Sequence, residues 1–545
     1  MNLLSHAAER GRSTLIWTAV LGVASGLAST ALLTLTARAL AAPAPRLADM
    51  FGFAALAIAA AAIRYVSATV SLRFTNLEQT DMAFDLCRVV VQAPLRRVEE
   101  LGGDRLMATL NDDLNVISRS IVELPGLVTN VVIVVGCFTY LAVFSRSIFL
   151  IVLAGFVFAL VPYMLIAKKA YARMMESRRE RDELMGHYRA LTDGITELKL
   201  HRPRRTAFLA DALRTVLHAI ARFNIEGQSL YNLANGYRQA VFALTAAPII
   251  FGGAYFGYDR GIATGAVLTL FYLFGPLDGV MNAFPMMARA NVALRSYERV
   301  LASLPAEDHG GAADARPIVR AAQIELSGIR YAYPGPEGFS IGPIDLSIQA
   351  GEILFIAGGN GSGKTTLAKI IAGLYEPTGG TLSVDGEPIT ARNRDHYRQL
   401  VTCVFAKFHL FRQLLGVDTR FLADRLRIWL RRLQLDRSLH VENGAFSTLD
   451  LSTGQRKRMA LLVAMIDDRP ICVFDEWAAE QDPVWRQEFY LNVLPELKAR
   501  GKAIVVITHD DRYFGVGDRL VRMEQGRIES HVISTAQPAA LWGRT

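Results

Sequence analysis

Residues 351–371 decide the class of fold, and their sequence is GEILFIAGGNGSGKTTLAKII. Apolar residues typical of a buried strand precede Gly358, and a helix-forming run follows Lys364. Between them the chain has the spacing GxxxxGK[ST], which Gly363, Lys364 and Thr365 complete. Glycines let such a loop curl until its N–H groups face a phosphate at the start of a helix. The run therefore predicts a P-loop in an α/β nucleotide-binding domain.

Each position of this loop has an expected partner in a magnesium nucleotide. We expect Lys364 to reach the β- and γ-phosphates and the Thr365 hydroxyl to bind Mg²⁺. A glycine-rich turn without a ligand is the alternative, and the strand and helix on either side disfavour it. The predicted contacts with ATP are Gly358, Gly359, Asn360, Gly361, Ser362, Gly363, Lys364, Thr365 and Thr366.

Two adjacent carboxylates end a later apolar strand, in the run RPICVFDEW at residues 469–477. A P-loop ATPase needs one carboxylate that holds Mg²⁺ and another group that orients the attacking water. We assign Asp475 to the metal and Glu476 to catalysis as the general base. An acidic pair that only caps the end of a strand is the alternative.

The pentapeptide LSTGQ at residues 451–455 opens a predicted helix. It resembles the LSxGQ signature of ABC proteins, and the order of the motifs along the chain is also that of the family. The resemblance implies that Ser452, Gly454 and Gln455 bind the γ-phosphate of ATP held on the P-loop of a second subunit. Without the other motifs, Ser452 would be interpreted as an ordinary helix N-cap.

The same resemblance assigns roles to three more residues. Tyr333, in IRYAYPG, looks like the aromatic residue that stacks on adenine, and His509, in IVVITHDD, looks like the histidine that contacts the γ-phosphate. Asp482 matches the last residue of the loop that links two nucleotide sites. In that loop the usual Ser-Ala-Leu-Asp is replaced by the sequence at residues 479–482, Ala-Glu-Gln-Asp.

The chain departs from the common ABC pattern at Ala406, in VFAKFHLF, where most members have a glutamine that contacts Mg²⁺. It also lacks the segment that multidrug exporters carry before the signature. With FDEWAAEQDPVW and THDDRYFGVGDRL, these features resemble the exporter branch for cyclic peptides and siderophores, which includes pyoverdine, syringomycin and microcin exporters. The resemblance implies a homodimer that exports a peptide or siderophore precursor across the bacterial inner membrane, with its nucleotide-binding domains in the cytoplasm.

The N-terminal half has the composition of a membrane domain. Apolar residues make up 51% of the chain, and they gather before residue 290. A bilayer-spanning helix needs about 20 such residues. Six segments approach this length, namely Thr14–Ala37, Leu47–Leu72, Ile121–Phe144, Ile148–Ala167, Gln239–Tyr258 and Ile262–Met286.

These segments predict an all-α, six-helix exporter-type transmembrane domain at residues 1–304. A Pro- and Gly-containing linker follows at 305–320, and the α/β P-loop domain occupies 321–545. Basic residues concentrate between the spans, which is typical of cytoplasmic loops. We therefore attribute the net charge of +8 to these cytoplasmic loops, and we expect no nucleic-acid partner. The four cysteines lack CxxC spacing and are expected to be reduced.

Three ionisable residues within or beside the spans have no assigned role. Arg64 and Arg238 could contact an anionic cargo, and Arg64 could instead extend to the membrane surface or pair with another helix. Asp278 could contact the substrate, pair with another helix or act as a hinge. Two other functions also stay open. One is lipid or drug extrusion, and the other is a slow ATP-gated regulator, if Ala406 impairs activation of water.

Overall fold

The computed structural model describes residues 3–41, 47–252, 260–307, 322–335, 338–416 and 419–533. The chain divides into two compact units. A helical unit comprises Met1–Leu86 and Leu106–Arg299, and an α/β unit comprises Cys87–Arg105 and Val300–Thr545. The α/β unit therefore includes a segment from the N-terminal half, and the domain limits expected from the sequence stay a prediction.

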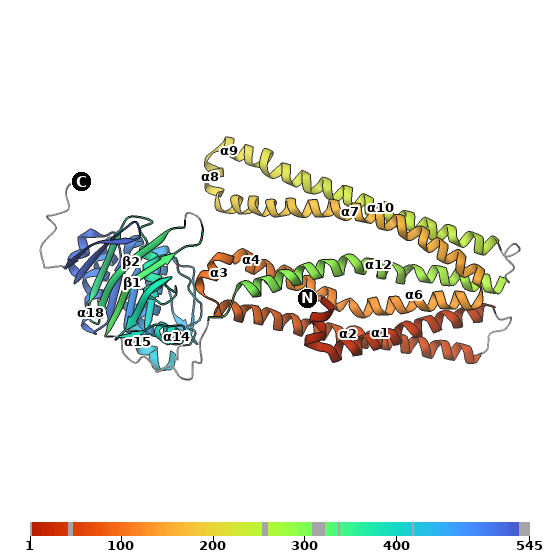
Figure 1. The fold of residues 1–545 in the computed structure, drawn as a ribbon, viewed down its shortest axis with the longest axis horizontal. Helices are drawn as coiled ribbons and strands as arrows, with labels where there is room; N and C mark the ends of the chain where they lie inside the picture. Colours follow the sequence, from red (N-terminus) through yellow and green to blue (C-terminus); the bar gives the residue numbers. More distant parts are fainter. Residues whose placement is uncertain are drawn as a thin grey trace. The chain divides into compact units, whose positions relative to one another are not determined.

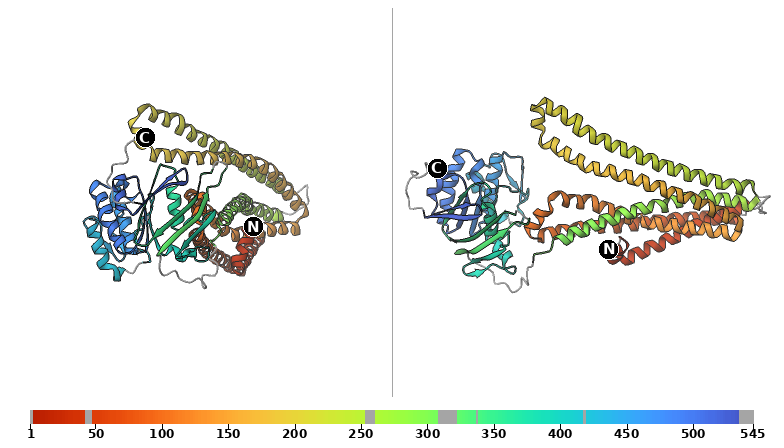
Figure 2. Two further views of the ribbon diagram at one scale, coloured as in Figure 1. Left: turned by 60° about the vertical axis from the view of Figure 1, so that its left-hand side comes forward. Right: turned by 45° about the horizontal axis from the view of Figure 1, so that its top comes forward.

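Long helices make up most of the helical unit (Figure 1). Helices α7 and α10 form a long antiparallel pair, which is closed at one end by α8 and α9 (Figures 1 and 2). Its elements are α1 (Leu3–Ala41), α2 (Leu47–Gln92), α4 (Gly103–Ala108), η1 (Thr109–Asp113), α5 (Leu114–Val122), α6 (Leu124–Phe144), α7 (Arg146–Asp193), α8 (Ile195–Leu200), α9 (Arg202–Ala207), η2 (Phe208–Leu213), α10 (Arg214–Phe251) and α12 (Arg260–Ser303).

Five helical stretches of the described chain are long and apolar enough to cross a membrane, and they contain five of the six predicted spans. They are Arg12–Ala39, Leu47–Gln92, Gly103–Phe144, Arg146–Asp193 and Gly261–Ser303. The remaining predicted span, Gln239–Tyr258, runs within α10 as far as Phe251, and residues 253–259 lie outside the described residues.

An ion pair joins two helices of this unit. Arg238 of α10 donates to the Asp278 carboxylate of α12 at 2.9 Å, and its guanidinium lies 4.5 Å from the ring centre of Phe274. The Arg238 side chain is 5% exposed, whereas that of Asp278 is 40% exposed. Arg238 and Asp278 therefore pair two helices, which is one of the roles that the sequence left open for Asp278. Arg64 lies exposed on α2.

The α/β unit is built on two main sheets. One is antiparallel, in the order β2-β1-β4-β5, and the other has the order β12-β11-β3-β10-β9-β6, with β7 and β8 forming a separate ribbon. The strands are β1 (Gln323–Ala332), β2 (Ser340–Gln349), β3 (Ile353–Gly358), β4 (Gly379–Val384), β5 (Glu387–Pro388), β6 (Val401–Val404), β7 (Val441–Glu442), β8 (Ala445–Phe446), β9 (Ile471–Asp475), β10 (Ala503–Ile507), β11 (Arg519–Glu524) and β12 (Arg527–Ile533).

Helices complete this unit. They are α3 (Leu95–Leu101), α13 (Lys364–Ile371), α14 (Arg394–Arg398), α15 (Thr419–Arg432), α16 (Thr453–Asp467), η3 (Trp477–Glu480), α17 (Pro483–Glu488), η4 (Phe489–Val493), α18 (Leu494–Ala499) and η5 (Asp511–Val516). Strands β11, β3, β10, β9 and β6 are parallel, and every residue of β9 and β10 is buried. Parallel strands covered on both faces require such continuous apolar runs, and ligands bind at their carboxyl ends.

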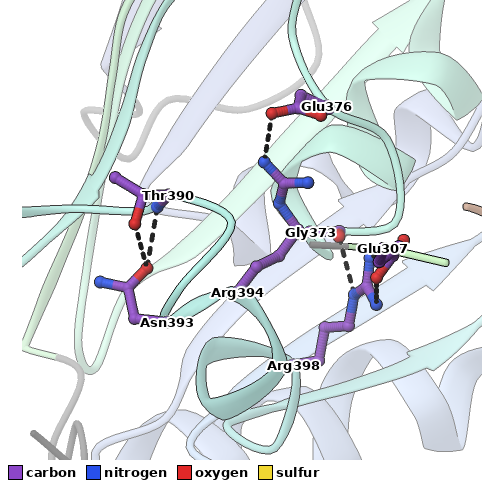
Figure 3. Close-up of polar contacts among 7 residues, drawn as sticks. All are labelled: Glu307, Gly373, Glu376, Thr390, Asn393, Arg394 and Arg398. Carbon is purple, nitrogen blue, oxygen red and sulfur yellow. Dashed lines mark hydrogen bonds and ion pairs between the residues drawn. The ribbon is translucent and has the colours of Figure 1, made fainter. Parts of the chain in front are cut away.

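Polar contacts fix the segments that enter and leave this unit (Figure 3). Arg398 donates to both carboxylate oxygens of Glu307, at 2.6 and 2.8 Å, and also to the Gly373 carbonyl at 2.8 Å. The Glu307 amide in turn donates to the Gln92 carbonyl at the end of α2. Glu307 lies in the predicted linker, so at least this part of the linker is anchored to the α/β unit.

Candidate functional site

The P-loop connects β3 to α13 and has the conformation that its glycines permit. Gly358, Gly361 and Gly363 have φ values of 152°, 78° and 99°, where a side chain is disfavoured. A β-carbon on Gly358 would lie 2.1 Å from the Met523 carbonyl, and one on Gly363 would lie 2.5 Å from Ile341. Two of these glycines are therefore required by close packing as well as by the backbone.

A cavity of about 810 Å³ opens beside this loop. The loop residues Gly358–Ser362 form one wall, and Phe339, His509, Arg522 and Gln525 contribute to the others. This volume lies in the usual range for a small-molecule site, about 300–1,000 Å³. Five of the nine predicted P-loop contacts thus line one cavity together with His509.

Lys364 begins α13 and is buried. Its ammonium donates to the carbonyls of Gly358 and Gly359 at 2.8 and 2.9 Å, so the side chain folds over the loop. Burial lowers the pKa of Lys364, while the nearby Glu476 and Asp475 carboxylates act to raise it. The cation therefore lies among groups of opposite charge, next to the backbone that is expected to hold phosphate.

Asp475 ends β9 and is 1% exposed. The Thr365 hydroxyl donates to its Oδ2 at 3.0 Å, and its buried Oδ1 has no hydrogen bond of ordinary geometry. Burial raises the pKa of Asp475, whereas the Thr365 hydrogen bond, Lys364 and the Ala406 amide act to lower it. A hard cation would use the unpartnered oxygen, so this pair fits Mg²⁺.

Metal ligands from the protein are few at this place. Among the described residues no group of three or more His, Cys, Asp or Glu side chains could hold a metal ion. Magnesium is usually bound by one or two carboxylates together with substrate phosphates. The pair formed by Asp475 and Thr365 therefore fits an ion that arrives with a nucleotide, and Mg²⁺ stays a prediction.

Glu476 and His509 lie side by side, although 32 residues separate them. Their side chains approach to 3.4 Å between Glu476 Oε1 and His509 Nε2. The contact arises because β9 and β10 are parallel neighbours, and each residue follows its strand at the same edge of the sheet. The predicted general base and the predicted phosphate-contacting histidine are thus brought together.

The LSTGQ run begins α16 and forms a complete capping box. The Ser452 hydroxyl accepts from the Gln455 amide at 3.4 Å, and the Gln455 side chain accepts from the Ser452 amide at 3.0 Å. Ser452 is therefore the N-cap of α16, as the alternative interpretation predicted. It does not exclude anion binding, because the remaining free N–H groups of a helix start attract phosphate. None of these five residues lines the P-loop cavity.

The two remaining residues predicted to contact the nucleotide, Tyr333 and Asp482, lie in different surroundings. The Tyr333 hydroxyl lies 3.0 Å from the Thr366 hydroxyl, which places this ring beside the start of α13. Asp482 accepts from the amides of Val484 and Trp485 and so caps α17. Thus Tyr333 lies near the predicted phosphate site, whereas Asp482 makes a local structural contact.

Two residues of this region were not singled out by the sequence. Phe339 lines the P-loop cavity and lies against the turn at Gly363. Lys457 of α16 is buried and donates to the Glu476 carbonyl at 3.0 Å. A single aromatic after PGPEG and a lysine within a basic run give no distinctive pattern, so only the fold identifies them.

Comparisons with known proteins agree with this geometry. A family profile described as ABC transporter matches residues 341–479. The chain is also 31% identical over 530 residues to ATP-binding protein SyrD of Pseudomonas syringae pv. syringae, covering 95% of this chain and 94% of that protein. The chain belongs to the ABC transporter family. The resemblance to exporter half-transporters, inferred from LSTGQ and its neighbours, is confirmed.

Other relatives of this ABC transporter match shorter parts. It is 30% identical over 275 residues to an ATP-dependent lipid A-core flippase of Alkalilimnicola ehrlichii, covering 48% of this chain and 46% of the flippase. It is 28% identical over 239 residues to the probable syringafactin export ATP-binding/permease protein SyfD of Pseudomonas syringae, covering 40% and 35% of the two chains.

One solved structure has the same fold along almost the whole chain. A bacterial Atm1-family ABC exporter with ATP bound superposes with a TM-score of 0.74 at 16% identity, covering 96% of this chain and 95% of that one. The expected fold class, a helical exporter-type domain with a P-loop domain, is confirmed. The transporter is a multi-pass membrane protein with an ATP-binding domain, and it is an ATPase coupled to transport.

Proposed function

We propose that this transporter exports a cyclic peptide, lipopeptide or siderophore precursor, and that two identical chains form the working unit. It would act in the bacterial inner membrane, with its nucleotide-binding domains in the cytoplasm. The observation that carries the proposal is the match to SyrD and to an exporter fold along nearly the whole chain. The name of SyfD, a probable syringafactin exporter, and the Asp-Glu-Trp-Ala-Ala run support a peptide cargo.

In this proposal the chain's own residues divide the work of hydrolysis. Lys364 and the P-loop amides hold the β- and γ-phosphates, and Asp475 with Thr365 would hold Mg²⁺, which neutralises phosphate charge when bound. Glu476 accepts the proton of the attacking water. His509, 3.4 Å from that carboxylate, contacts the γ-phosphate.

A homodimer is proposed because one chain contributes only part of a site. The signature residues do not line the cavity beside their own P-loop. A β-carbon on Gly454 would also come no closer than 3.7 Å to its neighbours, so packing within the chain does not require glycine there. Close approach of a ligand bound to a second copy would require it. Closure of two chains over ATP would then shift the helices between two states.

A cavity in the helical unit indicates what kind of cargo fits. It measures about 770 Å³ and lies between α7, α10 and α12. Its wall includes three arginines, Arg178, Arg181 and Arg289, and the described lining residues include no carboxylate. The same wall is otherwise largely apolar, with Met174, Met175, Ile225, Pro285 and Ala288.

These arginines make no ion pair with another described side chain. Ser177, which lines the same cavity, is 1% exposed, and its hydroxyl has no hydrogen-bond partner among the described residues. Guanidinium groups bind carboxylate or phosphate well, and methionines adapt to irregular apolar surfaces. We therefore propose an acidic amphiphile, and specifically an acylated peptide with free carboxylates, as the cargo.

Replacing two arginines of this cavity tests the cargo assignment. We expect Arg178→Gln combined with Arg289→Gln to raise the peptide concentration for half-maximal ATPase stimulation about tenfold, because charge-assisted hydrogen bonds are lost. Basal hydrolysis should not change. Arg179→Gln is the matched control, because Arg179 is exposed on α7 but does not line the cavity. An equal effect of both changes would contradict this site.

Lipid extrusion is the second candidate, favoured by the similarity to a lipid A-core flippase. A lipid with phosphates and acyl chains has the same general chemistry as an acidic lipopeptide. The two are separated by measuring ATPase activity of the reconstituted transporter with acidic acylated peptides, their amidated forms and lipid A precursors. Stimulation by lipid precursors alone would overturn the peptide assignment and leave ATP-driven export in place.

A further inference from the structure

Glu476 has an unusual backbone conformation for a residue with a side chain. Its φ and ψ are 52° and 34°, in the left-handed region. Residues other than glycine adopt this region rarely, and at functional sites the surroundings must hold them there. The Glu476 amide donates to the Ile507 carbonyl at 3.0 Å, which fixes the backbone on the N-terminal side of this residue.

Lys457 fixes the other side. It lies on α16 directly after the signature, two residues beyond Gln455, and is 4% exposed. Its ammonium donates to the Glu476 carbonyl at 3.0 Å and lies 3.5 Å from the Glu480 carboxylate. Since an ammonium is costly to bury, these contacts determine where it lies.

Contacts in the reverse direction complete the connection. The Trp477 indole N–H donates to the Lys457 carbonyl at 2.8 Å, and the Gln481 side-chain amide donates to the Gly454 carbonyl at 3.1 Å. The beginning of α16 is thus bonded at three points to the loop after β9. Trp477 is 2% exposed and packs against Phe489, so this loop has little freedom to move alone.

We propose that Lys457 is a positioning residue, which ties the Glu476 carboxylate to the signature helix of its own chain. The inference rests on the roles proposed above for Glu476 and for LSTGQ. When LSTGQ binds ATP held by the second copy, movement of α16 is passed through Lys457 and Trp477 to the Glu476 peptide. Occupation of one site thereby orients the general base of the other.

The variant Lys457→Met removes the ammonium and keeps a long, flexible, apolar side chain. We expect kcat for ATP to fall about tenfold to a hundredfold, the effect of losing one charge-assisted hydrogen bond during catalysis. KM for ATP and binding of a fluorescent ATP analogue should change less than about twofold, since the P-loop is not altered. ATP cooperativity should also be lost.

Lys502→Met is a closely matched control. Lys502 is 7% exposed, and its ammonium donates to the Arg469 carbonyl at 2.6 Å and pairs with Asp468 at 2.7 Å. Both lysines are thus buried, hold a backbone carbonyl and have one acidic partner. Lys502→Met should lower the melting temperature at least as much as Lys457→Met, with kcat almost unchanged.

Trp477→Phe gives an independent test, because it keeps a ring and removes the donor to Lys457. It should lower kcat, and its effect should not add to that of Lys457→Met, since both act on the same peptide. The effects of Lys457→Met and Lys502→Met should add. If Lys457→Met does not fold, the Trp477→Phe variant alone tests the proposal. An unchanged kcat of the Trp477→Phe protein would overturn it.

The inference and the proposed function fail in different ways. Equal kcat for Lys457→Met and Lys502→Met, with Glu476→Gln inactive, would overturn only the positioning role. Full activity of Glu476→Gln would overturn the assignment of the general base, and the positioning role with it.

Discussion

Glu476→Gln is expected to lower ATP hydrolysis about a hundredfold to ten-thousandfold, the usual contribution of a general base. Glutamine has the same shape and can keep the backbone contacts to Ile507 and Lys457, but it cannot accept a proton from water. ATP affinity should be kept, because Lys364 and Thr365 are unchanged. Phosphate release and binding of a fluorescent ATP analogue measure the two quantities.

Glu442→Gln is the control for this change. Glu442 has an exposed side chain and pairs only loosely with His440, at 3.5 Å. Its replacement should leave hydrolysis and melting temperature unchanged. Equal hydrolysis by the Glu476→Gln protein and the unmodified transporter would contradict catalytic use of Glu476. It would favour the regulator, in which nucleotide binding without efficient hydrolysis is sufficient.

Two inactive variants are expected to restore activity when they are co-expressed. Lys364→Ala removes the phosphate contact but keeps the signature, whereas Gly454→Asp places a negative charge in the signature and keeps the P-loop. Neighbours of Gly454 leave room for a β-carbon, so we expect the second variant to fold. A mixed dimer has one site in which an intact P-loop meets an intact signature.

Random pairing of the two chains should give at most about a quarter of full activity, since half of the dimers are mixed and each has one of two sites intact. The coupling proposed through Lys457 lowers this value further, because the chain that supplies the intact P-loop carries the altered signature. Separate purification tags on the two chains isolate the mixed dimer for a direct comparison. Each variant expressed alone, at the same total amount, supplies the control. If the mixture is as inactive as either variant alone, the shared site is wrong.

Local motifs of this chain could be interpreted from the sequence because each depends on a short run. The P-loop needs only β3, a turn and α13, and two of its glycines, Gly358 and Gly363, lie too close to neighbouring atoms to carry a side chain. The fold class followed from this run together with LSTGQ and the apolar spans. Asp475 and Glu476 followed from their place at the end of an apolar strand.

Contacts between segments that are distant along the chain could not be predicted from the sequence. The contact between Lys457 and Glu476 depends on how α16 packs against the loop after β9, and nothing in the basic run QRKR distinguishes the buried lysine from its neighbours. The ion pair between Arg238 and Asp278 likewise needs the packing of α10 against α12. Its two residues were candidates, but their pairing was one of several alternatives.

The segment Cys87–Arg105 illustrates the same limit at the level of domains. Its sequence continues the helical pattern of the preceding span, yet it belongs to the α/β unit. Glu99 pairs with Lys369 of α13 at 2.8 Å and also accepts from Tyr375. Charged residues of this kind are ordinary on a cytoplasmic helix, so only the fold shows which surface they contact.

ATP-driven uptake of a labelled acidic lipopeptide into inside-out vesicles tests the central claim most directly. Vesicles that contain the transporter should accumulate the peptide when given magnesium and ATP, and vesicles with the Glu476→Gln protein should not. Amidation of the peptide carboxylates should reduce uptake, and so should Arg178→Gln combined with Arg289→Gln. Accumulation that is equal with and without Glu476, or is absent for every peptide while a lipid is moved, would contradict the account.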